Sequence, residues 1–346
     1  MTLIYFVLVL SVTIFVHELG HFLFAKKAGI HVYEFCIGMG PRIFKFNRKN
    51  DETEYGIRLF PIGGYCAMAG ESVEIDENVK EDKRMQNKTW LQRFLTVIAG
   101  VMFNFIFAII IFFIIGLING NPNSKPIISE ISDTSPAYIS GLRQDDIITK
   151  INGVKVYTID RFMIEYQVGY GKNLELEILR NNEKINIVIS PTEIIDNEVT
   201  NYQYGFALDN SIERGFIEAI KYAFTKFISL IEQMFVIIWY LISGNLSLSN
   251  LSGPIGIYNI VGQSAQAGFL SIIYLIGYLS VNIGFLNLLP IPAFDGGRIL
   301  FLIIEKIRRK PMNPKIENII HSVGFILLMI LMIIITFNDI LRFFIK

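Results

Sequence analysis

The feature that most constrains this chain is the apolar run from Thr2 to Ala25, which carries polar side chains at His17, Glu18 and His21. The run is long enough to cross a bilayer as a helix, because about 20 residues at roughly 1.5 Å each span the hydrocarbon core. Ionisable side chains inside a membrane span are expensive to bury, so they indicate a functional site by default. The run therefore predicts a transmembrane helix that carries such a site.

The spacing of the polar residues indicates the kind of site. His17 and His21 are four residues apart, so on a helix they share one face and both imidazoles can reach one metal ion. Glu18 projects beside them, where it can hold a metal-bound water. This His-Glu-x-x-His pattern is typical of zinc proteases. Chance matches are far rarer inside a membrane span than on a soluble helix, because each polar residue there is costly. The pattern therefore predicts bound Zn²⁺.

Composition agrees with an integral membrane protein, since 52% of the residues are hydrophobic, 18% are charged and 28 are Phe. Three further apolar runs are long enough to span, at about residues 94–118, 269–290 and 319–344. Another run, 215–242, is interrupted by spaced charges, which favours an amphipathic helix at the interface over a span. About four transmembrane helices are therefore expected. Basic and acidic residues balance at 31 each, and no nucleic-acid partner is expected.

Basic residues close to the spans predict the orientation of the chain in a cell membrane. Lys26 and Lys27 follow the first run, and Lys88 and Arg93 precede the second. Further lysines and arginines lie between the last two runs. Both basic loops are expected in the cytoplasm, so both termini and the segment between the second and third runs face outside. The histidine pair then lies roughly 22 Å down the first helix. The metal site is thus expected in the cytoplasmic third of the membrane.

Residues 54–70 have the apolar sequence of a β-hairpin that turns at a Pro-Ile-Gly-Gly segment. Beside a membrane, such a hairpin can dip into the bilayer as a reentrant loop. Its free edge can then pair with an extended substrate strand, near Gly63 and Gly64. A cytoplasmic hairpin without substrate contact is an equal alternative. Cys36 and Cys66 are expected in the reducing cytoplasm, where structural thiols are the favoured interpretation.

Strand-like runs alternate with turns from about residue 126 to 191. A short capped helix is predicted from Ser135, a tight turn at Asn152-Gly153 and a hairpin turn at Asn181-Asn182. The pattern SPA…GL…D-I…ING resembles a bacterial-type PDZ domain, an α+β module that holds extended peptides in a groove. The expected domains are the first half of the membrane core (1–118), an extracytoplasmic PDZ-like domain (119–210), an interfacial helix with a linker (211–268) and the second half of the core (269–346).

A catalytic zinc site has three protein ligands and a water, so one ligand is still missing. The third span ends in NLLPIPAFDGG, where two prolines break the helix and two glycines permit a tight bend. Asp295 in this segment lies at the depth of the histidines and is the predicted third ligand. Asn282 and Asn287, amides in an apolar helix, are candidates to bind an unwound substrate backbone or to orient a ligand. Hydrogen bonding between helices is the alternative for both.

The pairing of VHELGH with NLLPIPAFDGG resembles the site-2 protease family of intramembrane zinc metalloproteases. RLFPIGGYCAMAGE is similar to the membrane-reentrant β-loop of that family, and NKTWLQRFLTVIAG to the entry of its second span. LSGPIGI is similar to the segment before the third span. Val101 stands where the family commonly has proline, and Phe294 where it has leucine. The layout is similar to that of the bacterial branch of the family, here with a single PDZ domain.

This resemblance implies that His17, His21 and Asp295 bind zinc, with Glu18 as the general acid/base and Asn282 and Asn287 handling substrate. It also implies single-pass membrane proteins as substrates, such as anti-sigma factors already trimmed outside the cell, or signal-peptide remnants. The PDZ-like domain would exclude untrimmed ectodomains. Two other functions remain open. One is a non-catalytic membrane scaffold with a structural, four-ligand zinc. The other is a membrane zincin that cuts soluble loops and uses a different third ligand.

Overall fold

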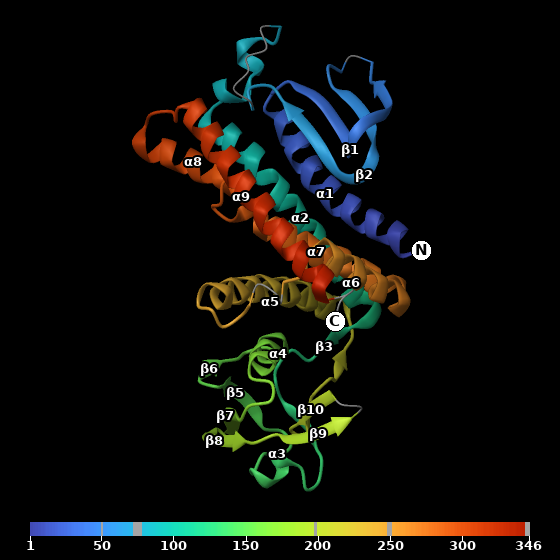
Figure 1. Ribbon diagram of the computed structural model, residues 1–346, viewed down its shortest axis with the longest axis vertical. Helices are drawn as coiled ribbons and strands as arrows, with labels where there is room; N and C mark the ends of the chain where they lie inside the picture. Colours follow the sequence, from blue (N-terminus) through green and yellow to red (C-terminus); the bar gives the residue numbers. More distant parts are fainter. Residues whose placement is uncertain (50, 72–77, 197–198, 248–250, 343–346) are drawn as a thin grey trace. The chain divides into compact units, whose positions relative to one another are not determined.

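The computed structural model describes residues 1–49, 51–71, 78–196, 199–247 and 251–342 (Figure 1). The chain forms two compact units. The helical unit comprises residues 1–111 and 248–346, and the β-rich unit comprises residues 112–247. Within the described residues, five helices are long and apolar enough to cross a membrane: α1 (Thr2–Lys27), α2 (Trp90–Asn119), α5 (Phe216–Ile242), α7 (Phe269–Leu288) and α9 (Pro314–Ile340).

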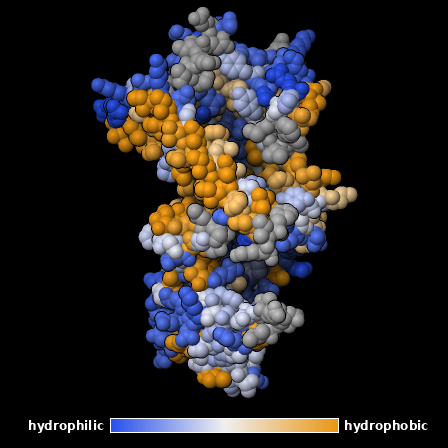
Figure 2. Space-filling view, in the orientation of Figure 1, coloured by the Kyte–Doolittle hydropathy of each residue, from blue (hydrophilic) through white to orange (hydrophobic). Residues whose placement is uncertain are grey.

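Four of these helices, α1, α2, α7 and α9, coincide with the predicted spanning runs, and the prediction of a multi-pass membrane protein is confirmed. A helix that faces lipid should have an apolar surface, and Figure 2 shows apolar side chains along α9. Helix α5 meets the same criterion of length and composition. Its predicted position at the interface therefore stays a prediction.

Local sequence explains where the helices of the second half of the core begin and end. Helix α7 ends at Leu288, because Pro290 and Pro292 cannot continue it. After the bend, α8 runs over Asp295–Arg308. Two other helices of the helical unit, α6 (Pro254–Ala267) and α9, begin with proline in the first turn, where its missing N–H is tolerated.

Helices α1 and α2 approach each other closely because both carry glycine where they meet. A Cβ atom added to Gly20 would lie 2.4 Å from the carbonyl oxygen of Ala99 and 3.0 Å from the Cα of Gly100. Small residues at a crossing let two backbones come together in a membrane, where apolar surface alone does not drive association. The crossing lies between the two histidines of α1, so it also places α2 beside the predicted metal site.

The helical unit contains a sheet formed by β1 (Val32–Asn47) and β2 (Glu54–Met68). The two halves of β2 do not pair with each other. Instead, residues 54–57 and 64–67 flank the segment 34–37 of β1 on its two sides. The prediction of a hairpin within residues 54–70 alone is therefore wrong, because the Pro-Ile-Gly-Gly bend leads β2 around β1. The sequence of β1 gave no strand signal, since two glycines and a proline interrupt it.

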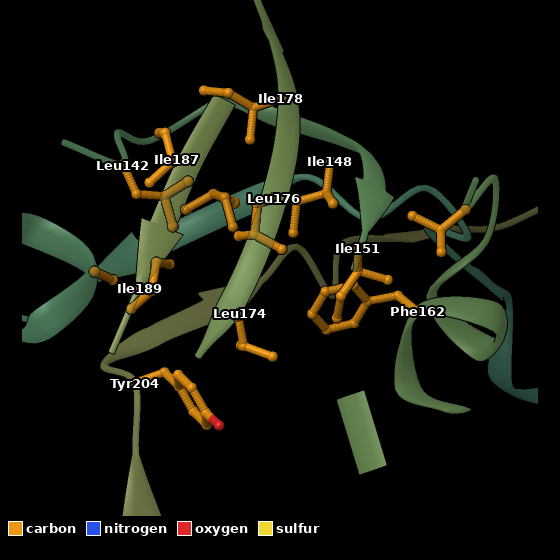
Figure 3. Close-up of a cluster of buried hydrophobic side chains, with 13 residues drawn as sticks. Leu142, Ile148, Ile151, Phe162, Leu174, Leu176, Ile178, Ile187, Ile189 and Tyr204 are labelled. Atoms are coloured by element: carbon orange, nitrogen blue, oxygen red, sulfur yellow. The ribbon is translucent and has the colours of Figure 1, made fainter. Parts of the chain in front are cut away.

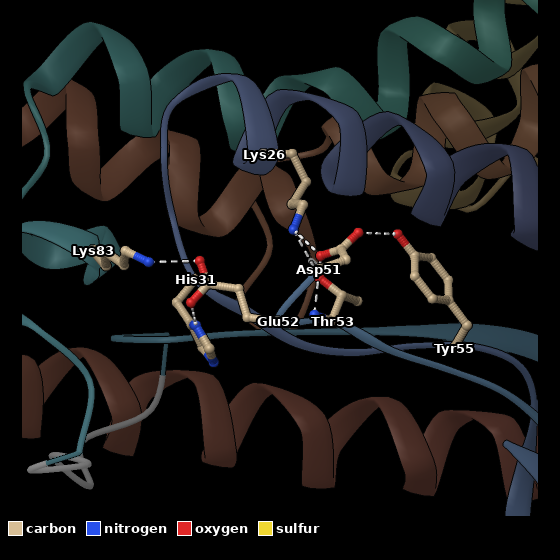
Figure 4. A network of polar contacts seen from close by, with 7 residues as sticks. All are labelled: Lys26, His31, Asp51, Glu52, Thr53, Tyr55 and Lys83. Atoms are coloured by element: carbon tan, nitrogen blue, oxygen red, sulfur yellow. Dashed lines mark hydrogen bonds and ion pairs between the residues drawn. The ribbon is translucent and has the colours of Figure 1, made fainter. Parts of the chain in front are cut away.

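Ion pairs attach the loop between β1 and β2 to the end of α1 and to the short helix η1 (Glu81–Lys83) (Figure 4). The Lys26 ammonium donates to Asp51 at 2.6 Å, and this bond holds the pKa of the Asp51 carboxyl well below its usual range. Lys83 donates to Glu52 at 2.6 Å, and His31 also contacts Glu52 at 2.9 Å. These bonds lower the pKa of Glu52, so both carboxylates are ionised at neutral pH and the loop is anchored.

The β-rich unit contains a four-stranded antiparallel sheet with the strand order β6-β5-β7-β8, and Ile127, just before β4, forms an isolated bridge with Ile147 of β5. Short two-stranded pairings complete the unit: β11 with β4, β10 with β9 and β12 with β3. The bounds are β3 (Asn121–Pro122), β4 (Ile128–Ile131), α3 (Pro136–Ile139), β5 (Ile147–Ile151), β6 (Val154–Lys155), α4 (Ile159–Val168), β7 (Leu174–Arg180), β8 (Glu183–Ile189), β9 (Thr192–Asp196), β10 (Val199–Gln203), β11 (Phe206–Leu208) and β12 (Ile212–Glu213).

The turn chemistry predicted for this unit is confirmed. Ser135 caps α3 by accepting from the backbone N–H of Tyr138. Asn152-Gly153 and Asn181-Asn182 close two hairpins with positive φ at both positions, as tight two-residue turns require. Inward-facing aliphatic residues of the sheet then pack with Phe162 of α4 and with Tyr204 into one core (Figure 3).

One buried ion pair in this unit predicts a large effect on stability. Asp146 is fully buried and accepts two bonds from the Arg180 guanidinium, each at 2.7 Å. Arg180→Ala would leave a buried carboxylate without its cation, which destabilises a fold by about 3 kcal/mol or more. Hydrogen exchange of the full chain should then accelerate roughly 100-fold in β7 and β8.

The matched control is Lys184→Ala, which removes an exposed cation from the same pair of strands. Lys184 lies 3.1 Å from Glu177 and its side chain is 64% exposed, so its removal should change exchange little. Equal exchange rates in the two variants would contradict a stabilising role of the Asp146–Arg180 pair.

Candidate active site

Two helices and a bend bring three ligand-type side chains together inside the helical unit. The Asp295 Oδ2 atom lies 3.1 Å from the Nε2 atoms of both His17 and His21, and these two nitrogens are 3.1 Å apart. The histidines are buried and Asp295 is 16% exposed. Among the described residues, these three form the one group of histidine, cysteine and carboxylate side chains that is arranged to hold a metal ion.

The pair of histidines owes its position to α1, and its ring orientation to α2. His21 Nδ1 lies 2.8 Å from the backbone carbonyl of Thr96. A carbonyl oxygen only accepts, so His21 Nδ1 carries the hydrogen and donates it. In the neutral imidazole, Nε2 then keeps its lone pair, which points toward His17 and Asp295. This is the tautomer that a metal ligand requires.

Glycine on α2 makes room for the two imidazoles. A Cβ atom on Gly100 would lie 2.4 Å from His21 Nε2 and 2.8 Å from His17 Cε1. No residue with a side chain fits at this position unless the rings move. One turn further along α2, the buried Asn104 has its Nδ2 atom 3.4 Å from His17 Nδ1.

Asp295 reaches the histidines because the chain bends sharply between α7 and α8. Gly296 lies so close to the preceding turn that an added Cβ would be 2.1 Å from the Leu289 carbonyl oxygen. Ala293 adopts a left-handed conformation with φ of 88°, which is strained for a residue with a side chain. Its N–H donates to His321 Nδ1 of α9 at 3.0 Å, so α9 helps to hold the bend that carries Asp295.

A cavity of about 630 Å³ opens beside the three residues. It is lined by residues of α1, α2, β2, α7, α8, α9 and the bend, and Glu18 is among them. A Cβ added to Gly64 would lie 2.8 Å from Glu18 Cγ, so β2 passes directly over this carboxylate. The lining thus combines the ligand cluster, a second acidic group and a strand.

The structure places the predicted substrate residues at different distances from this cavity. Asn287 lines it, and Gly64 lies next to Glu18. Gly63 has a φ of 97° and provides the bend of β2. Asn282 is not among the lining residues. Within the described part of the chain its buried Oδ1 has no hydrogen-bond partner.

Three residues that support the cluster are not predicted by the sequence patterns: Thr96, Gly100 and His321. Thr96 acts through its backbone, so no side-chain pattern could indicate it. His321 did carry a signal, because a histidine in an apolar span is costly. Because no other histidine lies within ligand spacing of it, the sequence favours an interfacial or packing residue at this position. The structure adds that it accepts a hydrogen bond from the strained bend.

The three donor atoms fit a zinc ion. Bonds of about 2.0–2.1 Å at tetrahedral angles place zinc ligands about 3.3 Å apart, close to the three spacings of 3.1 Å found here. Within the described residues, buried Asp295 Oδ2 has no hydrogen-bond partner. Converging lone pairs in a desolvated site repel each other unless a cation lies between them. The donor set therefore suits Zn²⁺ with one further coordination position.

A multi-pass membrane chain with such a buried cluster has the architecture of a membrane-embedded metalloenzyme. Comparison with known proteins identifies the family to which this metalloenzyme belongs. The model of peptidase family M50 matches residues 5–331. Zinc metalloprotease RasP of Oceanobacillus iheyensis is 33% identical, and the regulator of sigma-W protease RasP of Bacillus subtilis is 31% identical. A candidate zinc metalloprotease of Clostridium perfringens is 37% identical. Each alignment covers 99% of this chain and 99% of the relative.

The chain belongs to peptidase family M50, the site-2 proteases, and it is an intramembrane zinc metalloprotease. The resemblance found in the two sequence motifs is thereby confirmed, and so is Zn²⁺ as its cofactor. The match also extends far beyond the two motifs, since it includes the segment between them.

The contact between α1 and α2 generates a prediction about metal binding. Gly100→Ala should displace the imidazoles, because the added methyl group would overlap His21 Nε2. We expect the purified variant to retain less than a tenth of the zinc bound by the unmodified chain, measured by atomic emission. Gly262→Ala is the control, since a Cβ there meets only the flexible side chain of Thr2. Full zinc content in Gly100→Ala would contradict this account of the crossing.

Proposed function

We propose that this protein is an endopeptidase that cuts single-pass membrane proteins within or near their transmembrane segment. His17, His21 and Asp295 are its zinc ligands and Glu18 is its general acid/base. The observation that carries the proposal is the 3.1 Å triangle of donor atoms in a cavity that Glu18 also lines.

The residues of the cavity suggest how the reaction proceeds. Bound zinc would polarise the scissile carbonyl and lower the pKa of a water molecule to about 7. Glu18 would take the proton of the attacking water and deliver it to the leaving amine. Its place beside the ligands follows from the helix, since it is adjacent to His17 in sequence. A side chain at position 64 would collide with Glu18, so Gly64 lets β2 lie directly beside this residue.

The second half of β2 is suited to hold an extended substrate. Residues 64–68 pair with β1 on one side, and among the described residues the other edge has no strand partner. Cys66 and Met68 of this segment line the cavity. A helix must unwind before its peptide bonds can be cut, and the free backbone groups of an unwound segment can pair with such an edge. Gly63 provides the bend before the edge, and Asn287 of α7 lines the same cavity. Asn282 is a secondary candidate.

The expected substrates follow from the name of a relative. The Bacillus subtilis protein is called a regulator of sigma-W protease, and the two chains align over their full lengths. We infer that membrane-bound regulators of the anti-sigma-factor type are substrates of this chain, and that signal-peptide remnants share the required single apolar helix. The basic residues beside α1, α2 and α8 favour an orientation with both termini and the β-rich unit outside the cell. The active site then lies toward the cytoplasmic side.

The β-rich unit has features of a PDZ-like filter. A groove of about 740 Å³ lies between α4 and residues 202–210. Strand β11 borders the groove and pairs with β4 along its other edge. This arrangement of a helix beside a strand edge suits an extended peptide. It also suits a steric gate that rejects substrates with large ectodomains, and that function would require no ligand in the groove.

Contacts within the β-rich unit favour an interfacial position of α5. Lys226 pairs with Asp160 of α4 at 2.9 Å, and the Tyr240 hydroxyl donates to Glu165 at 2.6 Å. These two α5 residues are separated by about 21 Å of helix. A polar domain that contacts α5 over this length is incompatible with lipid all around it. The opposite face carries exposed apolar residues suited to lie on the membrane: Phe216, Ile217, Phe224, Ile228, Phe235, Trp239 and Ile242.

A non-catalytic scaffold with structural zinc is the alternative. A structural site would be closed by a fourth protein ligand, whereas the cluster among the described residues has three members. The third possibility, a zincin with another third ligand, loses support because Asp295 lies beside both histidines.

Replacing Glu18 separates the catalytic proposal from the scaffold. Glu18→Gln should keep bound zinc, because Glu18 is not a member of the ligand cluster. Cleavage of a model single-pass substrate in detergent should fall at least about 100-fold, since proton transfer is lost. Asp295→Ala is the companion variant and should lose both zinc and activity. Undiminished cleavage by Glu18→Gln would refute the proposed mechanism.

The interfacial position of α5 is tested by fluorescence quenching in lipid vesicles. The chain has two tryptophans, so Trp90→Phe with Trp239→Phe gives a background without them. Ile228→Trp then places a probe in the middle of α5, on the exposed apolar face. Lipids that carry bromine near the headgroups should quench the fluorescence of this tryptophan most. Ile106→Trp at the middle of α2 is the control and should respond most to bromines deep in the acyl chains. Equal depths would show that α5 spans the membrane.

A further inference from the structure

A single stripe of α2 supports both histidines of the metal cluster. Thr96, Gly100 and Asn104 are spaced by four residues, so they lie near one line along the helix. Thr96 meets His21, Gly100 lies against both rings and Asn104 meets His17. The zinc ligands therefore have a second layer of contacts, although α2 contributes no ligand to the described cluster.

At the His17 end of the stripe, the orientation of the Asn104 amide does not suit a histidine that binds metal through Nε2. Asn104 is fully buried, and its Nδ2 atom faces His17 Nδ1 at 3.4 Å. Its Oδ1 atom is also buried and has no hydrogen-bond partner among the described residues. Leaving a buried amide oxygen unpaired is destabilising, because the group has lost its contact with water. If Nδ2 donated to His17 Nδ1, the proton of the neutral imidazole would be on Nε2 and would point at the ligand cluster.

Rotating the side-chain amide of Asn104 by 180° gives Oδ1 a donor and frees His17 Nε2 of its proton, while Nδ2 takes the buried position that Oδ1 held. The nitrogen and oxygen of an amide have nearly the same shape, so their assignment has to follow the hydrogen-bond network. In the rotated amide, Oδ1 occupies the position that faces His17 Nδ1 and accepts its hydrogen. His17 Nε2 then carries a lone pair directed at Asp295 Oδ2 and His21 Nε2. Both histidines acquire the same tautomer, each fixed by a hydrogen-bond acceptor on α2.

We propose that Asn104 is a positioning residue that accepts a hydrogen bond from His17 Nδ1–H and so fixes His17 as a zinc ligand. The inference rests on the proposed role of His17 in binding zinc. It adds one requirement to the ligand set, which is an acceptor that keeps the proton of His17 on Nδ1. Without that acceptor the proton can occupy Nε2, and Nε2 then has no lone pair for the metal. Gly284 of α7 packs against Asn104, since a Cβ atom added to this glycine would lie 3.4 Å from Asn104 Cβ. This close packing holds Asn104 in place.

The test measures zinc affinity of the full chain in detergent by competition with a chelator. Asn104→Leu preserves the volume and removes the acceptor, whereas Asn104→Asp preserves an acceptor and removes the N–H donor. Loss of such a supporting contact typically lowers metal affinity 10- to 100-fold. We expect that loss in Asn104→Leu and an affinity within threefold of the unmodified chain in Asn104→Asp. The absorption of bound Co²⁺ should change in the leucine variant only.

Thr13→Val is the matched control, because Thr13 is a fully buried polar residue of α1 that hydrogen-bonds its own helix. It should bind zinc normally. If Asn104→Leu also binds normally, the residue only packs, and the inference is overturned. If both Asn104 variants lose affinity equally while remaining folded by thermal unfolding, the N–H donor is what matters, and the inference is again overturned. Failure of the unmodified chain to bind zinc would instead refute the proposed function.

Discussion

The structure depends on the mutual approach of three lone-pair donors inside an apolar helical unit. Two imidazoles and a carboxylate at 3.1 Å spacing repel each other and have lost much of their contact with water. A cation between them reverses the sign of this interaction. The elements around the cluster are arranged to make that approach possible. Gly20 and Gly100 allow α1 and α2 to cross beside the histidines, and the break after α7 directs Asp295 back into the helical unit.

The bend between α7 and α8 shows how the remaining helices contribute without providing ligands. A left-handed Ala293 is unfavourable on its own and needs external support. His321 provides part of that support by accepting the Ala293 N–H, and Gly324 lets α9 pack directly on Pro292. Helix α9 is largely covered by exposed apolar residues, and the bend is one of the places where it makes polar and close contacts with the rest of the helical unit. The proposed substrate edge of β2 lies on another side of the same cavity, where Gly64 faces Glu18.

Much of this could be predicted because membrane burial makes a few sequence signals strong. Apolar runs of sufficient length gave α1, α2, α7 and α9, since lipid leaves a backbone few alternatives to the helix. Turn residues gave the two hairpins of the β-rich unit, because asparagine and glycine adopt positive φ more readily than other residues. Strand β1 was missed, since Gly38, Gly40 and Pro41 interrupt its pattern and its pairing with β2 depends on residues far along the chain.

The sequence by itself determined the chemistry: the helical spacing that puts His17 and His21 on one face, and the proline-glycine break that turns the chain at Asp295. Periodicity and local backbone preference are properties of short segments, so they can be read without a fold. Only the tertiary structure decided what surrounds these residues. The acceptor of His21 is a backbone carbonyl on another helix, and the bend at Ala293 depends on a histidine in α9. Such partners meet through packing between distant segments, and no local pattern records which atoms will be in contact.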